Sequence, residues 1–173
     1  MGSRAPTWEA TYCEFFVSRE RPFMRTAYAI LGSWAQAEDE TQQTFSTLYV
    51  YWPRIRDGGH DAYARRVLVN RCLSNLRKRR HETLTDEVPD QPVTEVTDLA
   101  DSLDLRRAMQ ALKPRDRVLI TLRYLDDLPV AAVAEILRVP EGTVKSQTSR
   151  AVARLRRDLG HELGQPADLK EKS

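Results

Sequence analysis

Cysteine and histidine are scarce in this sequence of 173 residues, which limits the redox and metal chemistry open to it. The two cysteines, Cys13 and Cys72, lie far apart without CxxC spacing, so we expect them to be small apolar residues within helices. A redox or metal role is the alternative. The three histidines are scattered and do not have the spacing of metal ligands. We therefore predict no metal ion and no cofactor.

Long apolar runs and aromatic residues are also in short supply. No segment approaches the ~20 apolar residues that span a bilayer, and the first ten residues, MGSRAPTWEA, have no apolar core of the signal-peptide kind. Aromatic residues make up 8% and charged residues 30% of the chain, which indicates a globular protein with small cores. We expect a cytoplasmic protein without membrane insertion.

The motifs that usually carry catalysis are missing. The sequence has no glycine-rich phosphate loop ahead of a Lys-Ser/Thr pair, no nucleophile elbow and no H-E-x-x-H. Its carboxylates cluster in residues 82–104, largely within a stretch that we expect to be a flexible linker, where they could not hold a catalytic geometry. These absences predict that the protein is not an enzyme.

Charge is present in blocks, although the formal net charge is only +2. Residues 65–81 hold seven Lys or Arg and no carboxylate. Residues 82–104 hold eight carboxylates and no Lys or Arg, and residues 105–159 hold twelve basic and six acidic residues. This alternation predicts two nucleic-acid-facing modules joined by an anionic connector.

Hydrophobic periodicity predicts helices throughout and no β-strand. The predicted helices cover about residues 7–31, 34–51, 62–80 and 99–112, then one that opens at Pro114, then residues 130–137. Pro22 lies inside the first, so we expect that helix to break or restart there. In the helix over 62–80, apolar residues form one face and the seven cations are assigned to the opposite face. These cations favour nucleic-acid binding, with a solvated helix face as the alternative.

Residues 128–157 predict two short helices joined by a tight turn. Pro140 cannot continue the first helix, and Gly142 permits a sharp turn. We expect Thr143 to cap the second helix, and residues 126–127 to cap the pair. The second helix has an apolar face and a polar, basic face, which is the chemistry that a helix in a DNA major groove requires. A surface helix pair in any all-α protein is the alternative.

Two motif regions resemble those of one protein family. Residues 37–45, AEDETQQTF, are similar to A-E-D-hydrophobic-x-Q-E/D-x-F, and residues 61–71, DAYARRVLVNR, to W-L-x-R-I-A-x-N. Residues 112–124, LKPRDRVLITLRY, are similar to L-P-x-x-x-R-x-x-x-x-L-R-Y, and residues 142–151, GTVKSQTSRA, to G-T-V-K/R-S-R-x-x-R-A. In this order, the chain resembles the extracytoplasmic-function sigma factors of bacterial RNA polymerase. The form D-A-Y-x-R-R-x-L-V-N is similar to the actinobacterial SigE-like subgroup.

The chain departs from the family pattern at five positions. Thr41 and Gln43 stand where an apolar residue and a carboxylate are more common, and Tyr63 replaces a Trp. Gln147 and Ser149 replace residues that are often Arg and a bulky side chain. The resemblance implies that the first two departures lie in the helix that binds the polymerase and that the last two lie in the helix that reads the promoter.

The resemblance implies an all-α fold of two small helical domains joined by a flexible acidic linker. The expected parts are a sigma region 2 bundle over residues 7–81, the linker over 82–98, a region 4 helix-turn-helix domain over 99–160 and a disordered tail over 161–173. The implied function is a sigma factor that binds core polymerase, recognises the −35 and −10 promoter elements and melts DNA. A self-sufficient helix-turn-helix regulator is the alternative.

The resemblance also implies DNA contacts in both domains. The residues expected to read −35 bases are Lys145, Ser146, Ser149 and Arg150. The residues expected to hold −35 phosphates are Arg115, Arg117, Arg138, Thr143 and Arg154. The residues expected at the −10 element are Arg56, Tyr63, Arg65, Arg66, Asn70, Arg71 and Arg77, with the loop over 55–61 holding a flipped base.

The main partner that the resemblance implies is core RNA polymerase, contacted at the clamp helices of its largest subunit and the flap of its second-largest. The residues expected to bind it are Glu38, Asp39, Gln42, Gln43 and Phe45. The acidic linker is expected to occupy the RNA exit channel, or else to act only as a solvated tether. Double- and single-stranded promoter DNA is the second partner. The sequence leaves open whether an anti-sigma factor is a third.

Overall fold

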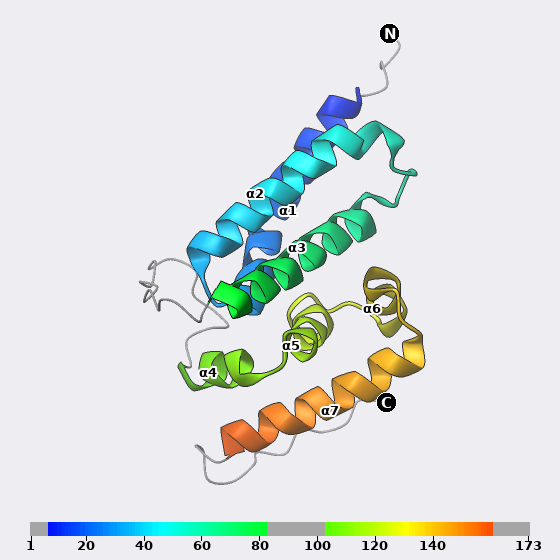
Figure 1. Ribbon diagram of the computed structural model, residues 1–173. Coiled ribbons are helices and arrows are strands. Elements are labelled where there is room, and N and C mark those ends of the chain that lie inside the picture. The colour runs from blue at the N-terminus through cyan, green and yellow to red at the C-terminus, as the bar shows by residue number, and fades with distance from the viewer. Residues whose placement is uncertain (1–6, 83–102, 161–173) are drawn as a thin grey trace.

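Every regular element in the described part of the chain is helical. The computed structural model describes residues 7–82 and 103–160 (Figure 1). The elements in order are α1 (Trp8–Leu31), α2 (Trp34–Tyr51), the 3-10 turn η1 (Trp52–Arg54), α3 (His60–Glu82), α4 (Leu103–Ala111), α5 (Pro114–Ile120), the π-helical turn η2 (Thr121–Leu125), α6 (Val130–Leu137) and α7 (Glu141–Gly160). The all-α prediction is confirmed. Among these described helices, none combines the length and the apolar character needed to cross a bilayer.

Helix α1 runs without interruption through Pro22, where the sequence predicted a break. Thr7 caps its start by accepting a first-turn backbone N–H at 3.4 Å, and Gly32 ends it with a φ of 74°. Pro22 is exposed, while the nearby rings of Phe15 and Phe23 pack edge-on at 6.2 Å toward the core. Phe23 also packs on Phe45 of α2, and this tertiary contact offsets the hydrogen bond that the proline cannot donate.

Aromatic side chains fill the core between α1, α2 and η1. Phe45 of α2 is 2% exposed, and its ring lies 5.7 Å from that of Phe23 in α1. The Tyr12 hydroxyl donates to the Phe45 carbonyl at 3.0 Å, and the Trp52 indole N–H donates to the Thr11 hydroxyl at 3.0 Å. Buried rings whose polar groups are satisfied hold α2 in one position on α1.

Helices α6 and α7 form the predicted helix-turn-helix, but the turn ends at Pro140 and its left-handed residue is Arg138 rather than a glycine. Arg138 takes the left-handed conformation with a φ of 54°, and the Val139 N–H donates to the Ala134 carbonyl at 3.0 Å, which is a Schellman-type helix end. Gly142 lies inside α7, which begins at Glu141. Thr143 therefore sits in the first turn of α7, and the prediction that it caps the helix is wrong.

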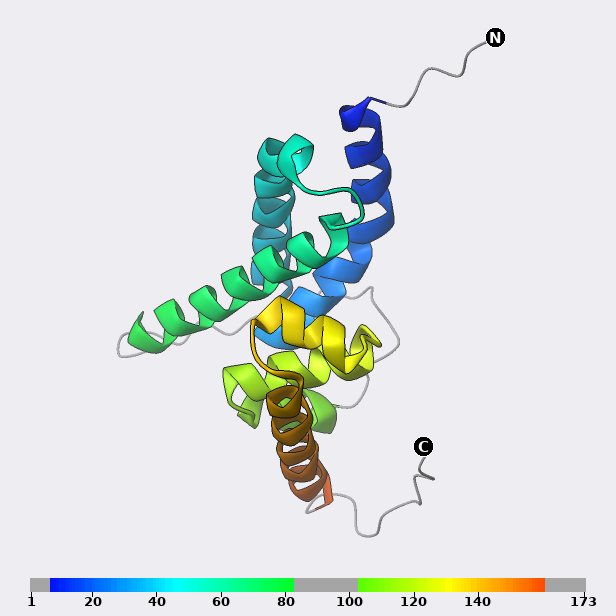
Figure 2. The same ribbon diagram turned by 90° about the vertical axis from the view of Figure 1, so that its right-hand side faces the viewer.

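The two halves of the chain pack against each other along a boundary that we call the seam. Figure 1 places α3 beside α5 and α6, and Figure 2 shows α6 beneath α3. One buried apolar cluster continues through both halves, from Phe23 and Leu68 to Leu119 and Val133. Periodicity predicted the helical units but not the seam, because it locates a buried face without naming what covers it. Residues 83–102, which hold most of the predicted linker, lie outside the described residues.

The two cysteines occupy different environments. Cys72 is fully buried in α3, and burial raises the pKa of its thiol to about 12, so it stays protonated and unreactive at neutral pH. Cys13 is exposed on α1, and both are free thiols. Cys72 therefore has the apolar packing role that its place in the helix predicted.

Candidate nucleic-acid interface

The outer face of α7 carries the four residues predicted to read bases. Lys145, Ser146, Ser149 and Arg150 are all exposed. They form two adjacent pairs four residues apart, so they share one face of the helix. The opposite face is buried through Val144, Thr148 and Ala151 and packs against α5 and α6. The sequence folds α7 in this way because its apolar residues recur at helical spacing, which leaves the polar stripe free for a ligand.

Arg150 is held in position by its own helix. Its Nε donates to the Ser146 carbonyl at 3.2 Å, and one terminal nitrogen approaches the Ser146 hydroxyl at 3.4 Å. Both contacts are exposed to solvent, so they orient the guanidinium without neutralising it. A guanidinium with free donors on an exposed helix face is suited to bidentate contact with guanine.

The residues predicted to hold phosphates fall into three environments. Arg115 and Arg138 are exposed, and Thr143 is half-buried. Arg154 forms an ion pair with Asp116 at 3.0 Å and remains partly exposed. Arg117 is only 5% exposed and donates to four oxygen atoms of the protein. In this structure it cannot reach a phosphate, so a structural role replaces the predicted contact.

Helix α3 was predicted to present all seven cations on the face opposite its apolar residues, and for Arg65 this is wrong. Arg65 is 8% exposed and pairs with Asp61 and Asp126, whereas Asn70 and Arg77 are exposed. The side chains of three others are partly exposed: Tyr63, Arg66 and Arg71. The structure therefore brings only part of the predicted melting set to one accessible face.

A buried carboxylate of α2 fixes α3 and was missed by sequence reasoning. Glu40 is 7% exposed; its carboxylate accepts from Arg71 Nε at 2.9 Å and from the Asn75 side-chain amide at 3.0 Å. Arg71 thus compensates a buried charge, which is costly to leave unpaired. The signal was present in the sequence, because Glu40 stands three residues after Ala37 and four before Thr44, both of which are buried.

The loop between η1 and α3 was predicted to hold a flipped base. Arg56, Asp57 and Gly58 are exposed, and Gly58 needs its left-handed φ of 78° to make the turn. The loop is anchored where α3 begins, because the His60 ring stacks on Trp52 with centroids 4.0 Å apart. His60, which had no role from the sequence, is the residue that holds this end of the loop.

The predicted polymerase-binding residues of α2 do not all reach the surface. Glu38, Asp39, Gln42 and Gln43 are exposed along one side of the helix. Phe45 is buried in the aromatic core and cannot contact a partner in this structure. Two large side chains near the end of α2, Tyr49 and Val50, are 49% and 61% exposed and extend the outer side of the helix.

Comparison with known protein families gives two matches that together cover most of the described chain. The family described as Sigma-70 region 2 matches residues 15–82. The family described as Sigma-70, region 4 matches residues 102–155. The first includes α2 and α3, and the second includes the helix-turn-helix.

Relatives of known name are similar along nearly the same length. The chain is 32% identical over 149 residues to the RNA polymerase sigma-E factor of Streptomyces coelicolor, covering 84% of each chain. It is 34% identical over 149 residues to the RNA polymerase sigma-E factor of Streptomyces antibioticus, covering 84% of this chain and 83% of the relative.

Two solved structures share the fold. The sigma factor RpoE from Bartonella quintana, in complex with the anti-sigma factor NepR, superposes with a TM-score of 0.73 at 22% identity, covering 90% of this chain and 99% of the other. CnrH, in complex with the cytosolic domain of CnrY, superposes with a TM-score of 0.71 at 16% identity, covering 91% and 92%.

Proposed function

This chain belongs to the extracytoplasmic-function sigma factors of the sigma-70 family, and on that premise we propose which of its surfaces engage the promoter and the polymerase. Its function is to direct promoter-specific initiation of transcription together with core RNA polymerase. It is a regulator that acts by binding. Because it binds polymerase and DNA, we place its action in the cytoplasm.

The observation that carries the proposal is the exposed stripe on α7. Lys145, Ser146, Ser149 and Arg150 read bases of the −35 element in the major groove, with Arg150 on a guanine. Arg115, Arg138, Thr143 and Arg154 hold the flanking phosphates. Such phosphate contacts supply salt-dependent affinity but little sequence choice.

The second proposed DNA-binding surface is the accessible face of α3. Asn70 and Arg77 are exposed on it and meet the displaced strand of the −10 element, while Arg56 in the preceding loop lies where a flipped base would enter. Extraction of a base costs a few kcal/mol, so a loop already anchored by His60 lowers the cost of melting. Arg65, Arg66 and Arg71 add to this surface only if their contacts within the protein are released.

The exposed side of α2 faces the polymerase. Glu38, Asp39, Gln42 and Gln43 bind the clamp helices of the largest subunit, and Tyr49 and Val50 extend the surface. Region 4 meets the flap of the second-largest subunit, and the acidic residues of 82–98 enter the RNA exit channel. Since one solved structure of this fold is a complex with an anti-sigma factor, we also propose an anti-sigma partner for this chain.

A self-sufficient helix-turn-helix regulator is the second candidate. It accounts for α6 and α7 but gives no role to residues 15–82, which match sigma region 2. Run-off transcription with purified core polymerase separates the two. The sigma factor yields promoter-dependent transcripts only when both components are present. A chain that binds specific DNA tightly without polymerase, and supports no transcript from any genomic fragment, would contradict the proposal.

Substitution of Asn70 by alanine tests the melting surface. Asn70 is exposed, so its loss should leave folding intact while removing a hydrogen bond to a base edge. We expect slower open-complex formation on duplex promoters with little change in closed-complex binding, measured by permanganate reactivity and filter binding. A template already melted at −10 should restore the rate. Ser74→Ala, on another exposed residue of α3, is the control, and equal rates for both variants would remove Asn70 from the surface.

A further inference from the structure

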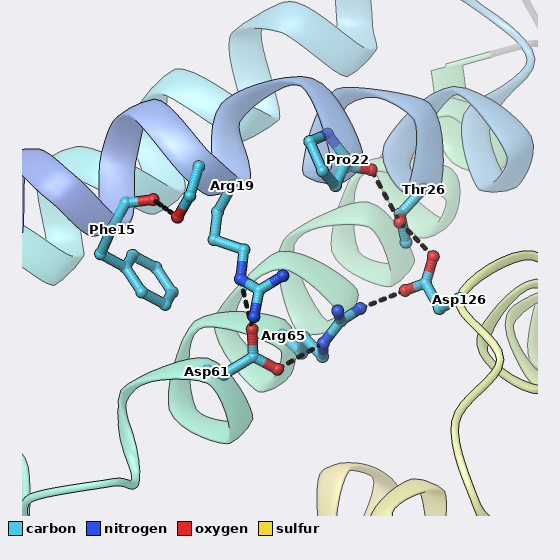
Figure 3. A network of polar contacts seen from close by, with 8 residues as sticks. Phe15, Arg19, Pro22, Thr26, Asp61, Arg65 and Asp126 are labelled. Carbon is cyan, nitrogen blue, oxygen red and sulfur yellow. Dashed lines mark hydrogen bonds and ion pairs between the residues drawn. The ribbon is translucent and has the colours of Figure 1, made fainter.

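The seam is closed by a buried polar network centred on Asp126 (Figure 3). Its Oδ1 accepts a hydrogen bond from the Thr26 hydroxyl of α1 at 2.7 Å, and its Oδ2 pairs with Arg65 of α3. The side chains of Arg65 and Asp126 are 10% and 7% exposed. The sequence predicted that Asp126 caps the helix-turn-helix, and this is wrong: Pro129 stands at the start of α6, and Asp126 points across the seam.

The local backbone aims Asp126 at the first half. Helix α5 continues into the π-helical turn η2, where the Asp126 N–H donates to the Thr121 carbonyl at 3.0 Å, and Asp127 then takes a left-handed φ of 50°. A π-helical turn and a left-handed aspartate are both uncommon, and they tend to occur where a side chain must be directed to a particular place.

The network continues on the other side of Arg65. Its Nε donates to Asp61 at 2.7 Å, and Asp61 also pairs with Arg19 of α1 at 2.9 Å. The Arg65 guanidinium lies 5.4 Å from the centre of the Phe23 ring. Burial raises the pKa of Asp126, while the hydrogen bond from Thr26 and the charge of Arg65 lower it. These partners compensate a charge that would otherwise be expensive to bury.

A second set of contacts crosses the seam at the end of α1. The last turn of α1 has no basic residue of its own. Instead Arg117 of α5 donates to the Ile30 carbonyl at 2.6 Å, and Arg106 of α4 donates to the Gly32 carbonyl at 3.3 Å. Carbonyls at a helix end lack intrahelical partners and favour a cation. The second half therefore supplies the cap of a helix in the first half.

Arg66 makes a third crossing. One terminal nitrogen donates to the Glu135 backbone carbonyl of α6 at 3.3 Å and lies 3.9 Å from the Glu135 carboxylate. Arg65 and Arg66, both predicted to meet the displaced DNA strand, are thus occupied by the second half of the same chain. Beside these contacts, a groove of about 370 Å³ lies between Tyr28 of α1 and Leu155 of α7, so the apolar packing of the seam is incomplete on this side.

The closed form is also too short for a promoter. Elements centred at −35 and −10 lie about 25 base pairs apart, which is about 85 Å of duplex at 3.4 Å per step. A compact chain of 173 residues has a radius of gyration of about 16 Å. The DNA-binding faces of α3 and α7 therefore cannot reach both elements until the seam opens.

We propose that Asp126, Thr26 and Arg65 form an autoinhibitory latch that holds this sigma factor closed until core polymerase separates its halves. The latch rests on the proposed function for its biological meaning, but its physical prediction concerns the free chain. Breaking the latch should favour the open form. The apparent affinity for core polymerase should then rise, because the closed fraction no longer competes with binding.

The test compares Asp126→Asn with Asp127→Asn in the full-length chain. Asparagine at 126 keeps the shape but removes the carboxylate that pairs with Arg65 across the seam, which leaves only Asp61 on its own helix as a charged partner. Asp127 is exposed outside the network, and asparagine tolerates its left-handed conformation, so Asp127→Asn is the matched control. We expect Asp126→Asn to increase the radius of gyration measured by small-angle X-ray scattering. It should also tighten the apparent Kd for core polymerase by roughly threefold to tenfold.

Thr26→Val keeps the test decisive if Asp126→Asn does not fold. It removes one hydrogen bond of the latch, and Thr44→Val, at a buried threonine that bonds only to its own helix, is its control. Latch variants that equal their controls in both scattering and Kd would overturn the latch, as would weaker polymerase binding by Asp126→Asn. A wild-type chain inactive in run-off transcription would refute the proposed function, whereas a scattering difference would still support the latch.

Discussion

Replacing Arg117 with alanine is expected to lower the free energy of unfolding by about 3–5 kcal/mol. Arg117 is 5% exposed and donates to the backbone carbonyls of Ile30, Gln110 and Leu112 and to the Gln110 side chain. Alanine would remove the donor from all four oxygens, of which the Ile30 and Leu112 carbonyls make buried hydrogen bonds. Each buried acceptor left unsatisfied costs about 1–3 kcal/mol.

The measurement is urea unfolding followed by circular dichroism, with the midpoint and slope fitted together. Arg115→Ala is the matched control, because Arg115 is exposed two residues earlier in α5, and we expect a change within about 0.5 kcal/mol. Arg117→Lys should fall between them, since a single ammonium cannot span carbonyls on two sides. Equal stability of the Arg117→Ala and Arg115→Ala variants would show that the buried hydrogen bonds contribute little.

Periodicity was sufficient for the helices and for the reading face, because both depend on residues close in sequence. The α7 stripe is an example: apolar residues such as Val144 and Ala151 decide which side is buried, and the four polar positions follow. Local rules were less reliable at turns. The predicted break at Pro22 did not occur, and Arg138 rather than Gly142 makes the left-handed turn, because packing on both sides overrides local preference.

The charged residues of the seam were harder to predict, since their partners lie far away in the chain. Arg65 precedes the buried residues Leu68 and Cys72 by three and seven positions, so helical spacing alone assigns it to the inner face. Spacing could not reveal that Asp126, 61 residues later, neutralises it. The number of cations in α3 predicted a DNA-binding helix. In the structure, some of these cations, such as Arg65, form ion pairs within the protein, and others, such as Arg77, are exposed.

Replacing Arg150 with alanine is expected to weaken −35 recognition by about 1–3 kcal/mol, or about fivefold to 150-fold in affinity. Arg150 is exposed and, within the described residues, donates hydrogen bonds only to Ser146, so the substitution should not affect folding. The loss should be specific: bidentate contact with guanine discriminates one base pair, and alanine should relax the preference there. Holoenzyme binding to a cognate promoter and to single-base variants of its −35 element measures this change.

Arg157→Ala provides the comparison that separates base reading from phosphate binding. Arg157 is exposed nearer the end of α7, and a phosphate contact there would weaken all sequences equally and reduce the salt slope by about one. Arg150→Ala should instead leave the slope nearly unchanged while flattening the preference at one position. If Arg150→Ala weakens every promoter variant by the same factor and lowers the slope, Arg150 holds a phosphate. The choice of base would then belong to Lys145, Ser146 and Ser149.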